Sequence, residues 1–415
     1  MRSIAYVTTT FPTLASFIEN EVHRLRRRGV RVRVFTLRPV GRDHQPEHRP
    51  LLEVTRSVGS VLDPRGWVAL IRWLFRRPHV LLPEAGRMLW ASRGSLYALA
   101  GHLGYLPAAA RVASAVEAED LEQVHGAWAH FPASVAYLAA RLTGRRFSIA
   151  AHAGADLYRT QAFLAHKVRA ADFTVACVRT NADMLRVLAG PRARVEWIYH
   201  GVDLGRFDGA GRSRDPQPLL LAVGRLSPAK GFDDAVRALG MLGQRGPRPR
   251  LVLVGDGPQR AQLERLALDL GVAEQVEFRG ALYQEQILPL YRSAWLLLAP
   301  SKVMSNGRRD GIPNVIIEAM AMGVPCLGTR AAGLEEVISP GETGALIDPG
   351  DIAGLAGTLE SLLRAPDHLD RMGLTARERV RRLFDAERNF DRLMEIFSGE
   401  DAPVMESGPR EVPAR

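Results

Sequence analysis

An acidic residue and a glutamate, separated by seven positions, bracket the start of an apolar helical segment. Asp310 comes directly before the segment, and Glu318 lies more than one helical turn inside it. The residues that begin the predicted helix are Gly311, Ile312, Pro313 and Asn314. Pro313 suits a first helical turn, whose amides and positive dipole end bind a phosphate or a sugar oxygen. Carboxylates accept hydrogen bonds from hydroxyls, so the segment predicts a site for a phosphorylated, hydroxyl-rich ligand. The alternative is an ordinary helix with a solvated glutamate.

A second candidate site follows the strand predicted to end at Val223. Gly224 and Arg225 are followed, after a short loop, by Lys230 and Gly231 at the start of a helix. Arginine can hold two phosphate oxygens at once and lysine adds a point charge, so this loop predicts a clamp for a diphosphate. The lysine stands out because 52 of the 55 basic residues (55 − 3) are arginine. A surface loop with two solvated cations is the alternative.

Two histidines in the first half of the chain each end a predicted strand. His130 lies two residues after Trp128, and His152 begins a short turn that ends at Asp156. A single histidine of this kind is more often a structural imidazole than a reactive group. Parallel sheets, however, bind ligands beyond the carboxyl ends of their strands. The position of both histidines therefore favours a role in lining a cleft.

Strands alternate with helices along most of the chain, which predicts two parallel sheets with helices on both faces. The expected parts are a first domain at 1–208 with a loop at 41–50 and a helical segment at 61–116, a linker at 209–218, a second domain at 219–374, a charged crossover helix at 375–398 and a disordered tail at 399–415. The predicted fold class is α/β, with two Rossmann-like, doubly wound domains facing a cleft.

The composition is that of a soluble globular protein large enough for two domains. The chain has 415 residues, of which 47% are hydrophobic and 24% charged. No run approaches eighteen uncharged apolar residues, so no spanning helix is predicted, and the first residues do not resemble a signal peptide. Cys177 and Cys326 are expected to be reduced structural thiols rather than a disulfide, which fits a cytoplasmic protein.

Positive charge is concentrated in the first half of the chain. Residues 1–208 contain 29 Lys and Arg against 17 Asp and Glu, giving +12, whereas the remainder contains 26 against 28, giving −2. This asymmetry indicates an anionic partner for the first half. Nucleic acid is disfavoured because the arginines are not interleaved with aromatic residues.

An amphipathic stripe lies within the helical segment 61–116. Its apolar members are Trp67, Leu70, Ile71 and Leu74, and the neighbouring cations are Arg72, Arg76 and Arg77. The stripe predicts either contact with an anionic membrane or a helix packed on the domain core.

A glycine motif after the strand predicted at 251–254 superficially resembles a dinucleotide fingerprint. It reads Gly255-Asp256-Gly257-Pro258, with Arg260 where a third glycine would stand. Asp256 would repel a pyrophosphate, and Pro258 removes an amide from the helix start that should hold it. The motif therefore does not predict a nicotinamide-dependent dehydrogenase.

Taken in order along the chain, these motifs resemble glycosyltransferase family 4, the retaining enzymes of GT-B fold. The matching segments are Gly224-Arg225, Lys230-Gly231, Val254 to Pro258, Pro300-Ser301, Asp310 to Met322 and Gly333 to Glu336. Asp310 and Glu318 fill that family's paired acidic motif, with Asp in place of the commoner Glu. The histidine segments resemble those of members that build polysaccharides and lipopolysaccharides. The segment from Thr10 to Ile18 departs from the pattern, because it lacks the paired glycines of many members.

The resemblance implies a role for each of these residues. Arg225 and Lys230 would hold the diphosphate of a nucleotide sugar, Glu318 would bind its ribose, and Glu336 would add a further donor contact. Asp310 and the amides that follow it would hold the transferred sugar. His130 and His152 would lie beside that sugar in the first domain.

The implied activity is transfer of a hexose from a nucleotide-diphosphate sugar to a glycan acceptor, soluble or lipid-linked, with retention of the anomeric configuration. The resemblance implies no cofactor, and the absence of any Asp-x-Asp motif fits an enzyme that needs no metal. The expected setting is the cytoplasm or the inner face of the plasma membrane, in the assembly of cell-surface polysaccharide. A sugar-nucleotide epimerase, a phosphorylase or a non-catalytic sugar-nucleotide-binding protein of the same fold remain alternatives.

Overall fold

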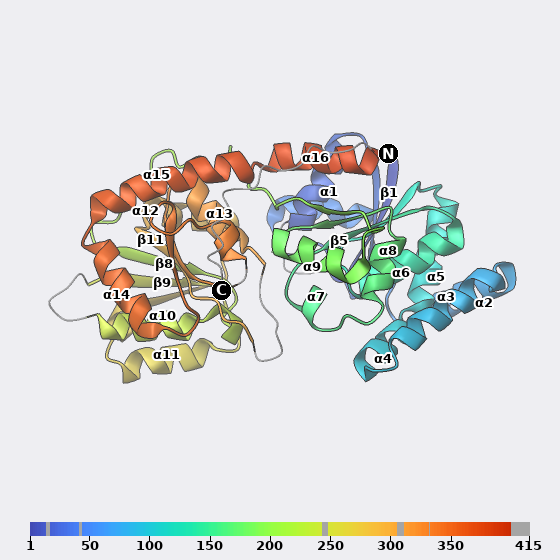
Figure 1. Cartoon of the computed structure of the whole chain (residues 1–415), viewed down its shortest axis with the longest axis horizontal. Helices are drawn as coiled ribbons and strands as arrows, with labels where there is room; N and C mark the ends of the chain where they lie inside the picture. The colour runs from blue at the N-terminus through green and yellow to red at the C-terminus, as the bar shows by residue number, and fades with distance from the viewer. Residues whose placement is uncertain (14–16, 41–43, 243–247, 305–310, 332, 400–415) are drawn as a thin grey trace. The chain divides into compact units, whose positions relative to one another are not determined.

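The chain folds into two compact units, each built around one parallel sheet (Figure 1). The computed structural model describes residues 1–13, 17–40, 44–242, 248–304, 311–331 and 333–399. The first unit comprises Met1–Ile198 and the described residues from Phe390 onward, and the second comprises Tyr199–Asn389. No helix among the described residues is long and apolar enough to cross a membrane.

Seven parallel strands form the sheet of the first unit, in the order β3-β2-β1-β4-β5-β6-β7. They are β1 Ser3–Thr8, β2 Arg31–Thr36, β3 Thr55–Ser57, β4 Gln123–Gly126, β5 Arg146–Ala151, β6 Phe173–Ala176 and β7 Val195–Trp197. The first six occupy the order 3-2-1-4-5-6 of the Rossmann fold.

Helices cover both faces of this sheet. They are α1 Phe17–Arg27, α2 Pro64–Arg76, α3 Pro78–Ala91, α4 Leu96–Gly104, α5 Leu106–Ala118, α6 Phe131–Thr143, α7 Ala155–Tyr158, α8 Leu164–Ala170 and α9 Arg179–Ala189. Successive side chains of β1 alternate between two hydrophobic clusters, with Ala5 and Val7 in one and Ile4 and Tyr6 in the other. The second of these clusters also contains residues of α1 and of the carboxy-terminal helix.

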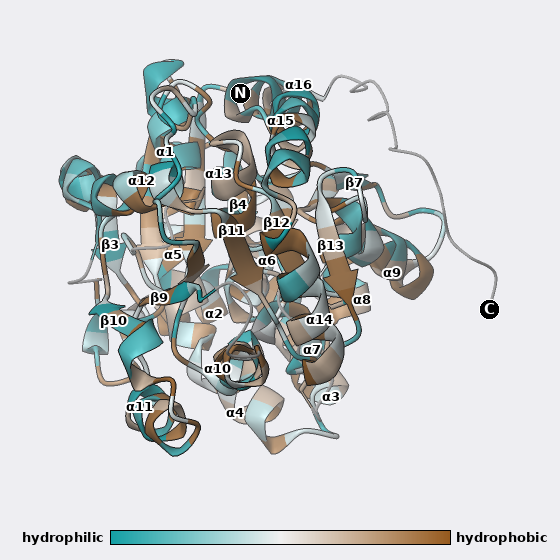
Figure 2. Ribbon diagram, turned by 90° about the vertical axis from the view of Figure 1, so that its left-hand side faces the viewer, coloured by the Kyte–Doolittle hydropathy of each residue, from teal (hydrophilic) through white to brown (hydrophobic). Residues whose placement is uncertain are grey.

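Six parallel strands form the sheet of the second unit, in the order β10-β9-β8-β11-β12-β13. They are β8 Leu219–Val223, β9 Arg250–Val254, β10 Val276–Gly280, β11 Leu296–Ala299, β12 Cys326–Thr329 and β13 Gly344–Ile347. The helices are α10 Phe232–Met241, α11 Arg260–Asp269, α12 Gln284–Ser293, α13 Asn314–Ala321, α14 Ile352–Leu363 and α15 Pro366–Leu383. Helix α16 Ala386–Ser398 begins in the second unit, and from Phe390 onward it belongs to the first. In Figure 2, β11 and β13 appear brown, as expected for strands buried between helical layers.

Both sheets have their topological switch point between the first strand and the fourth. In the second unit this point lies between β8 and β11, which are neighbours in the sheet and pair with each other in parallel. Ligands of open parallel sheets bind outside the carboxyl ends of the strands at such a point. The residues after Val223 and after Ala299 therefore occupy the expected ligand position of this unit.

The predicted linker at 209–218 lies inside the second unit rather than before it. Arg250 bonds to the Asp215 carboxylate at 2.8 Å, and the indole of Trp295 donates to the Asp215 carbonyl at 2.7 Å. Arg212 donates to the carbonyl of Ala294. These bonds explain why a polar, proline-containing stretch packs against the domain that follows it.

Two local expectations are corrected. The segment predicted as a loop at 41–50 contains the start of a 3-10 helix, η1 Pro46–Val54, in which His48 and Leu51 are buried. The helix predicted at 375–398 is two helices, α15 and α16, that part at Phe384 and Asp385. The Asp385 carboxylate accepts from the amides of Glu387 at 2.9 Å and of Arg388 at 3.2 Å, so it starts a new helix. The tail from residue 400 lies outside the described residues.

Removal of this cap should destabilise the protein. Asp385→Ala deletes both hydrogen bonds to the first turn of α16 and is expected to lower the free energy of unfolding by about 1 kcal/mol. Asp385→Asn keeps an acceptor oxygen and should lose much less. Urea unfolding followed by circular dichroism measures the difference, and equal losses in both variants would contradict the capping role.

Candidate active site

The loop after β8 carries the predicted cation pair. Arg225 is exposed, and Lys230 is half-buried at the end of the 3-10 turn η2 Pro228–Lys230. The Lys230 stem runs beside Gly224, since a Cβ added there would lie 3.3 Å from the lysine Cε. Both cations thus come from the loop at the switch point, as the sequence predicts.

Lys302, which the sequence prediction missed, follows the neighbouring strand β11 and holds this loop in place. Its amide donates to the Ala229 carbonyl at 2.9 Å. Its ammonium bonds to Asp233 at 2.9 Å and Asp234 at 2.8 Å on α10. Burial lowers the pKa of Lys302, but the two carboxylates outweigh this effect and leave the pKa raised. The lysine therefore stays charged and ties β11 to the loop that presents Lys230.

The glycines of this region allow backbones to approach closely. Gly231 has φ +66°, and a Cβ there would lie 1.8 Å from the Pro300 carbonyl oxygen. A Cβ on Gly255 would lie 2.0 Å from the Gly224 oxygen, and one on Gly257 would lie 2.4 Å from the Leu226 oxygen. The Gly255–Gly257 motif thus serves contact between the loops after β8 and β9.

Helix α13 begins one residue later than expected. Pro313 has extended backbone, with ψ 130°, and caps the helix from outside, so Asn314 is the first helical residue. Gly311 and Ile312 precede them and, like Pro313 and Asn314, are half-buried. Asp310 lies outside the described residues. Because α13 connects the parallel strands β11 and β12, it begins at the carboxyl edge of the sheet, where its amides face the same side as the loop after β8.

Glu318 is a buried carboxylate held from both sides. It is 6% exposed, and it accepts hydrogen bonds from the Tyr291 hydroxyl and the Gln284 side chain, both at 2.9 Å. Burial raises its pKa, although these donors act in the opposite direction. The sequence analysis did not find Tyr291 or Gln284, since neither has a motif of its own. Each carboxylate oxygen has a second lone pair, so the two bonds fix the orientation of Glu318 without exhausting it as an acceptor.

Glu336 lies in the 3-10 turn η4 Leu334–Glu336 that follows β12 and Gly333. It is half-buried, and its carboxylate accepts from the Tyr199 hydroxyl at 3.0 Å. The Arg379 guanidinium donates to its carbonyl at 3.1 Å. The carboxyl end of β12 thus adds an acidic residue to the edge that carries the β8 loop and the start of α13.

In the first unit, one buried carboxylate organises both predicted histidines. Asp156 Oδ1 accepts from the His130 amide at 3.0 Å and from His130 Nδ1 at 2.9 Å, and Oδ2 accepts from the His152 amide at 2.8 Å. Burial raises the pKa of Asp156, but these donors outweigh it and the net pKa is lowered. Asp156 is therefore ionised, and its bond to Nδ1 turns the Nε2 edge of the His130 ring away from it.

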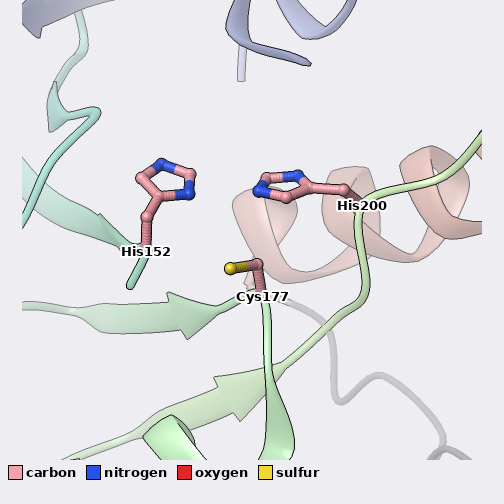
Figure 3. A group of neighbouring side chains, drawn as sticks. All are labelled: His152, Cys177 and His200. Carbon is pink, nitrogen blue, oxygen red and sulfur yellow. The ribbon is translucent and has the colours of Figure 1, made fainter. Parts of the chain in front are cut away.

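His152 follows β5 and lies beside Cys177, which follows the paired strand β6 (Figure 3). His200, also labelled in Figure 3, belongs to the second unit. Burial lowers the pKa of His152, and its Nε2 donates to the Ala127 carbonyl at 3.1 Å. The ring of Trp128 packs on His152 with centroids 4.6 Å apart. His152 is thus a neutral, packed imidazole at the sheet edge. Both cysteines are buried thiols outside any disulfide, as predicted.

Lys167 on α8 is a buried cation beneath the His130 turn. It is 1% exposed, and its ammonium donates to the carbonyls of Ala129 and His130 at 2.6 Å and to Ser134 Oγ at 3.0 Å. Burial lowers its pKa to about 7, against the opposing charge of Asp156. The sequence offered only the rarity of lysine as a signal for this role.

Loss of Lys167 should cost stability and change its pH dependence. Lys167→Met removes the ammonium that donates to the Ala129 and His130 carbonyls and to Ser134 Oγ, and it is expected to lower the free energy of unfolding by about 3 kcal/mol. In the wild type the folded pKa lies below the unfolded value of about 10.4, so the unfolded state binds more protons and stability rises from pH 7 toward pH 10.

Urea unfolding at pH 7, 8 and 9 measures both effects. The methionine variant should lack the part of the rise that Lys167 contributes. An unchanged slope would contradict the titration of Lys167, and an unchanged midpoint would contradict its structural role.

Comparison with known proteins identifies the second unit. Residues 206–379 match the family model described as "Glycosyl transferases group 1". A GDP-mannose-dependent alpha-(1-6)-phosphatidylinositol monomannoside mannosyltransferase of Mycolicibacterium smegmatis is 33% identical over 220 residues, covering 51% of this chain and 58% of the relative. The chain thus spans somewhat over half the length of that relative. An N-acetyl-alpha-D-glucosaminyl L-malate synthase of Bacillus anthracis is 28% identical over 310 residues, covering 70% and 78%.

Solved structures share the fold across nearly the whole chain. HepE of Anabaena in complex with UDP-glucose superposes with a TM-score of 0.71 at 18% identity, covering 96% of this chain and 100% of the other. Sucrose-phosphate synthase of Thermosynechococcus elongatus gives 0.70 at 20% identity, covering 96% and 99%. The chain therefore carries a group 1 glycosyl transferase domain at residues 206–379 and shares the GT-B fold of these solved structures.

Proposed function

We propose that this protein is a retaining glycosyltransferase that moves a hexose from a nucleotide-diphosphate sugar to a glycan acceptor in the assembly of cell-surface polysaccharide. One observation carries the proposal: the loops after β8 and β12 and the start of α13 occupy one edge of a single sheet, within the matched segment 206–379. That edge combines two cations, helix amides and acidic acceptors. Diphosphate, sugar and ribose hydroxyls require these groups.

Each side chain has a separate task in this reaction. Arg225 and Lys230 bind the diphosphate and stabilise the negative charge that grows on it as it leaves. The amides at Gly311, Ile312 and Asn314, together with Asp310, hold the transferred sugar, while Glu318 and Glu336 accept from further hydroxyls of the donor. The Lys302 brace keeps the cation loop in place before the donor arrives, so less reorganisation is needed in the transition state.

The bonds exchanged can be written in full. The bond between the anomeric carbon and the phosphate oxygen breaks, and a bond from the same carbon to the acceptor oxygen forms on the same face. The acceptor proton passes to the departing diphosphate, which leaves as the nucleoside diphosphate. We propose that His130 and His152, which Asp156 positions within the first unit, contact the transferred sugar. Proton NMR of the product, showing the anomer of the donor, tests retention, and an inverted product would contradict it.

We further propose that no metal ion takes part, on the ground that the chain contains no Asp-x-Asp motif. The family resemblance supports the same proposal for an organic cofactor. Turnover should therefore persist in excess EDTA, after dialysis against chelator. Loss of turnover that Mg²⁺ or Mn²⁺ restores would overturn this part of the proposal.

Lys230 is expected to matter more for turnover than for donor binding. Lys230→Ala removes a charge partner that gains strength as the leaving group forms, so kcat should fall by about a hundred-fold or more. Arg237→Ala, on the exposed side of α10, is the matched control and should leave kcat unchanged. Steady-state release of nucleoside diphosphate measures both, and a kcat for Lys230→Ala within a few-fold of wild type would contradict the clamp.

The donor can be identified directly. HepE was solved with UDP-glucose, and the mycobacterial relative is named for GDP-mannose, so a panel of UDP-, GDP- and ADP-sugars covers the candidates. The cognate donor should raise Tm more than the others in a thermal-shift assay, because binding to the folded state alone stabilises it. Slow release of nucleoside diphosphate without acceptor would favour a transferase. Binding with no such release would favour a non-catalytic protein, and conversion to an epimeric nucleotide sugar would favour an epimerase.

We also propose that the enzyme works at the inner face of the plasma membrane, where a lipid-linked glycan is the acceptor. Support comes from the basic first half of the chain, with its net charge of +12 (29 − 17) over residues 1–208. A soluble glycan remains the alternative acceptor.

A further inference from the structure

Helices α2, α3 and α4 leave large apolar side chains in solvent. Of the nineteen large exposed hydrophobic residues in the described chain, twelve fall between residues 61 and 103. They are Val61, Leu62, Trp67, Val68, Ile71, Leu74, Phe75, Leu82, Trp90, Leu96, Tyr97 and Leu103. We call these side chains the apolar patch. The remaining seven are scattered over the rest of both units, so the patch is a local feature.

The patch on α2 occupies the side of the helix that faces away from the domain. Trp67, Val68, Ile71, Leu74 and Phe75 follow the three- and four-residue spacing of one helical face and are 37–83% exposed. The opposite face packs on α5. There Trp73 is 2% exposed and donates to Ser114 at 3.0 Å, and Gly66 lies against Pro107.

These contacts show that α2 packs on the domain core mainly through residues outside the predicted stripe. Trp73 and Gly66 are the buried residues through which α2 packs on the domain core, and Leu70 is half-buried beside them. The stripe residues Trp67, Ile71 and Leu74 are not needed to hold α2 to its domain.

The charges around the patch are almost all positive. Residues 61–104 contain six arginines and two acidic residues. Both carboxylates are already engaged within the domain, Asp63 by Arg111 at 2.6 Å and Glu84 by Tyr137 at 2.5 Å. On α2, Arg65, Arg72 and Arg76 are exposed and lie next to the apolar arc rather than within it, and Arg76 also pairs with Glu117 of α5. An apolar face flanked by arginines complements the boundary between acyl chains and anionic headgroups.

We infer that α2, α3 and α4 form a docking face for an anionic lipid bilayer, in which the apolar patch enters the acyl boundary and the arginines contact headgroup phosphates. The inference rests on the proposed function only in that such docking would bring the donor site to a lipid-linked acceptor. A bilayer is favoured over a protein partner because the charges of residues 61–104 are mostly of one sign, which complements a layer of anionic headgroups.

A triple variant tests the apolar contribution. Val68→Ser, Phe75→Ser and Trp90→Ser remove side chains that are 66%, 83% and 69% exposed, so the fold should be retained. The matched control is Val187→Ser, Leu268→Ser and Leu374→Ser, whose side chains are 85%, 65% and 63% exposed elsewhere. Co-sedimentation with vesicles of phosphatidylglycerol and phosphatidylcholine should show binding of the full-length protein. The patch variant should bind at least about ten-fold more weakly, and the control should bind as the wild type.

A second variant, in which two arginines lose their charge, tests the electrostatic contribution to vesicle binding. Arg65→Gln with Arg72→Gln should weaken binding to the anionic vesicles, and added salt should reduce the difference from wild type. Vesicles of phosphatidylcholine alone should bind the wild type less well than the anionic ones. Equal binding to both kinds of vesicle would overturn the anionic specificity.

Two further outcomes would overturn the inference as a whole. One is the absence of wild-type binding to anionic vesicles. The other is a dimer in analytical ultracentrifugation that the patch variant converts to monomer, which would identify a second copy of the chain as the occupant. Release of nucleoside diphosphate from the donor in solution, measured on the same variants, should be unchanged. A loss of docking is therefore distinguishable from a failure of the proposed transferase.

Discussion

Parallel pairing of β8 with β9 on one side and β11 on the other is the constraint on which the second unit's chemistry depends. Because these strands run in the same direction, their loops emerge at one edge, and α13 must start there to return to β12. Residues far apart in the sequence, such as Lys230 and Glu336, thereby reach the same edge without any local signal for it. The glycines at 224, 231, 255 and 257 then let these loops pack closely enough to act as one surface.

Buried and half-buried charges supply the rigidity that such an edge needs. Lys302 ties its own strand to α10 and to the cation loop, while Lys167 holds the turn that carries His130. The Asp156 carboxylate links two segments, because it accepts hydrogen bonds from the amides of both His130 and His152. A buried ion that is fully bonded contributes little net stability, but removing one partner is costly, so each of these groups enforces one local geometry.

The sequence predicts the architecture well, because burial between helices demands apolar strands and caps mark the helix ends. The two sheets and the residues of the cation loop follow from such local patterns. Prediction fails where a distant contact overrides composition: 209–218 reads as a linker until Arg250 and Trp295 bond to it. It also fails where one polar side chain ends one helix and starts another, as Asp385 does between α15 and α16. The partners of Glu318 were missed because Tyr291 and Gln284 contact it only after folding.

The return of the carboxy-terminal helix makes the first unit discontinuous in sequence. Phe390, Leu393, Ile396 and Phe397 share a hydrophobic cluster with Ile4 and Tyr6, so one face of the amino-terminal sheet is completed by α16, which follows the whole second sheet in the sequence. A nascent chain that has reached only Ile198 still exposes this face. The complete core of the amino-terminal unit can thus form only after the residues up to Phe397 have been synthesised, and a gene fragment encoding the first half alone lacks part of that core.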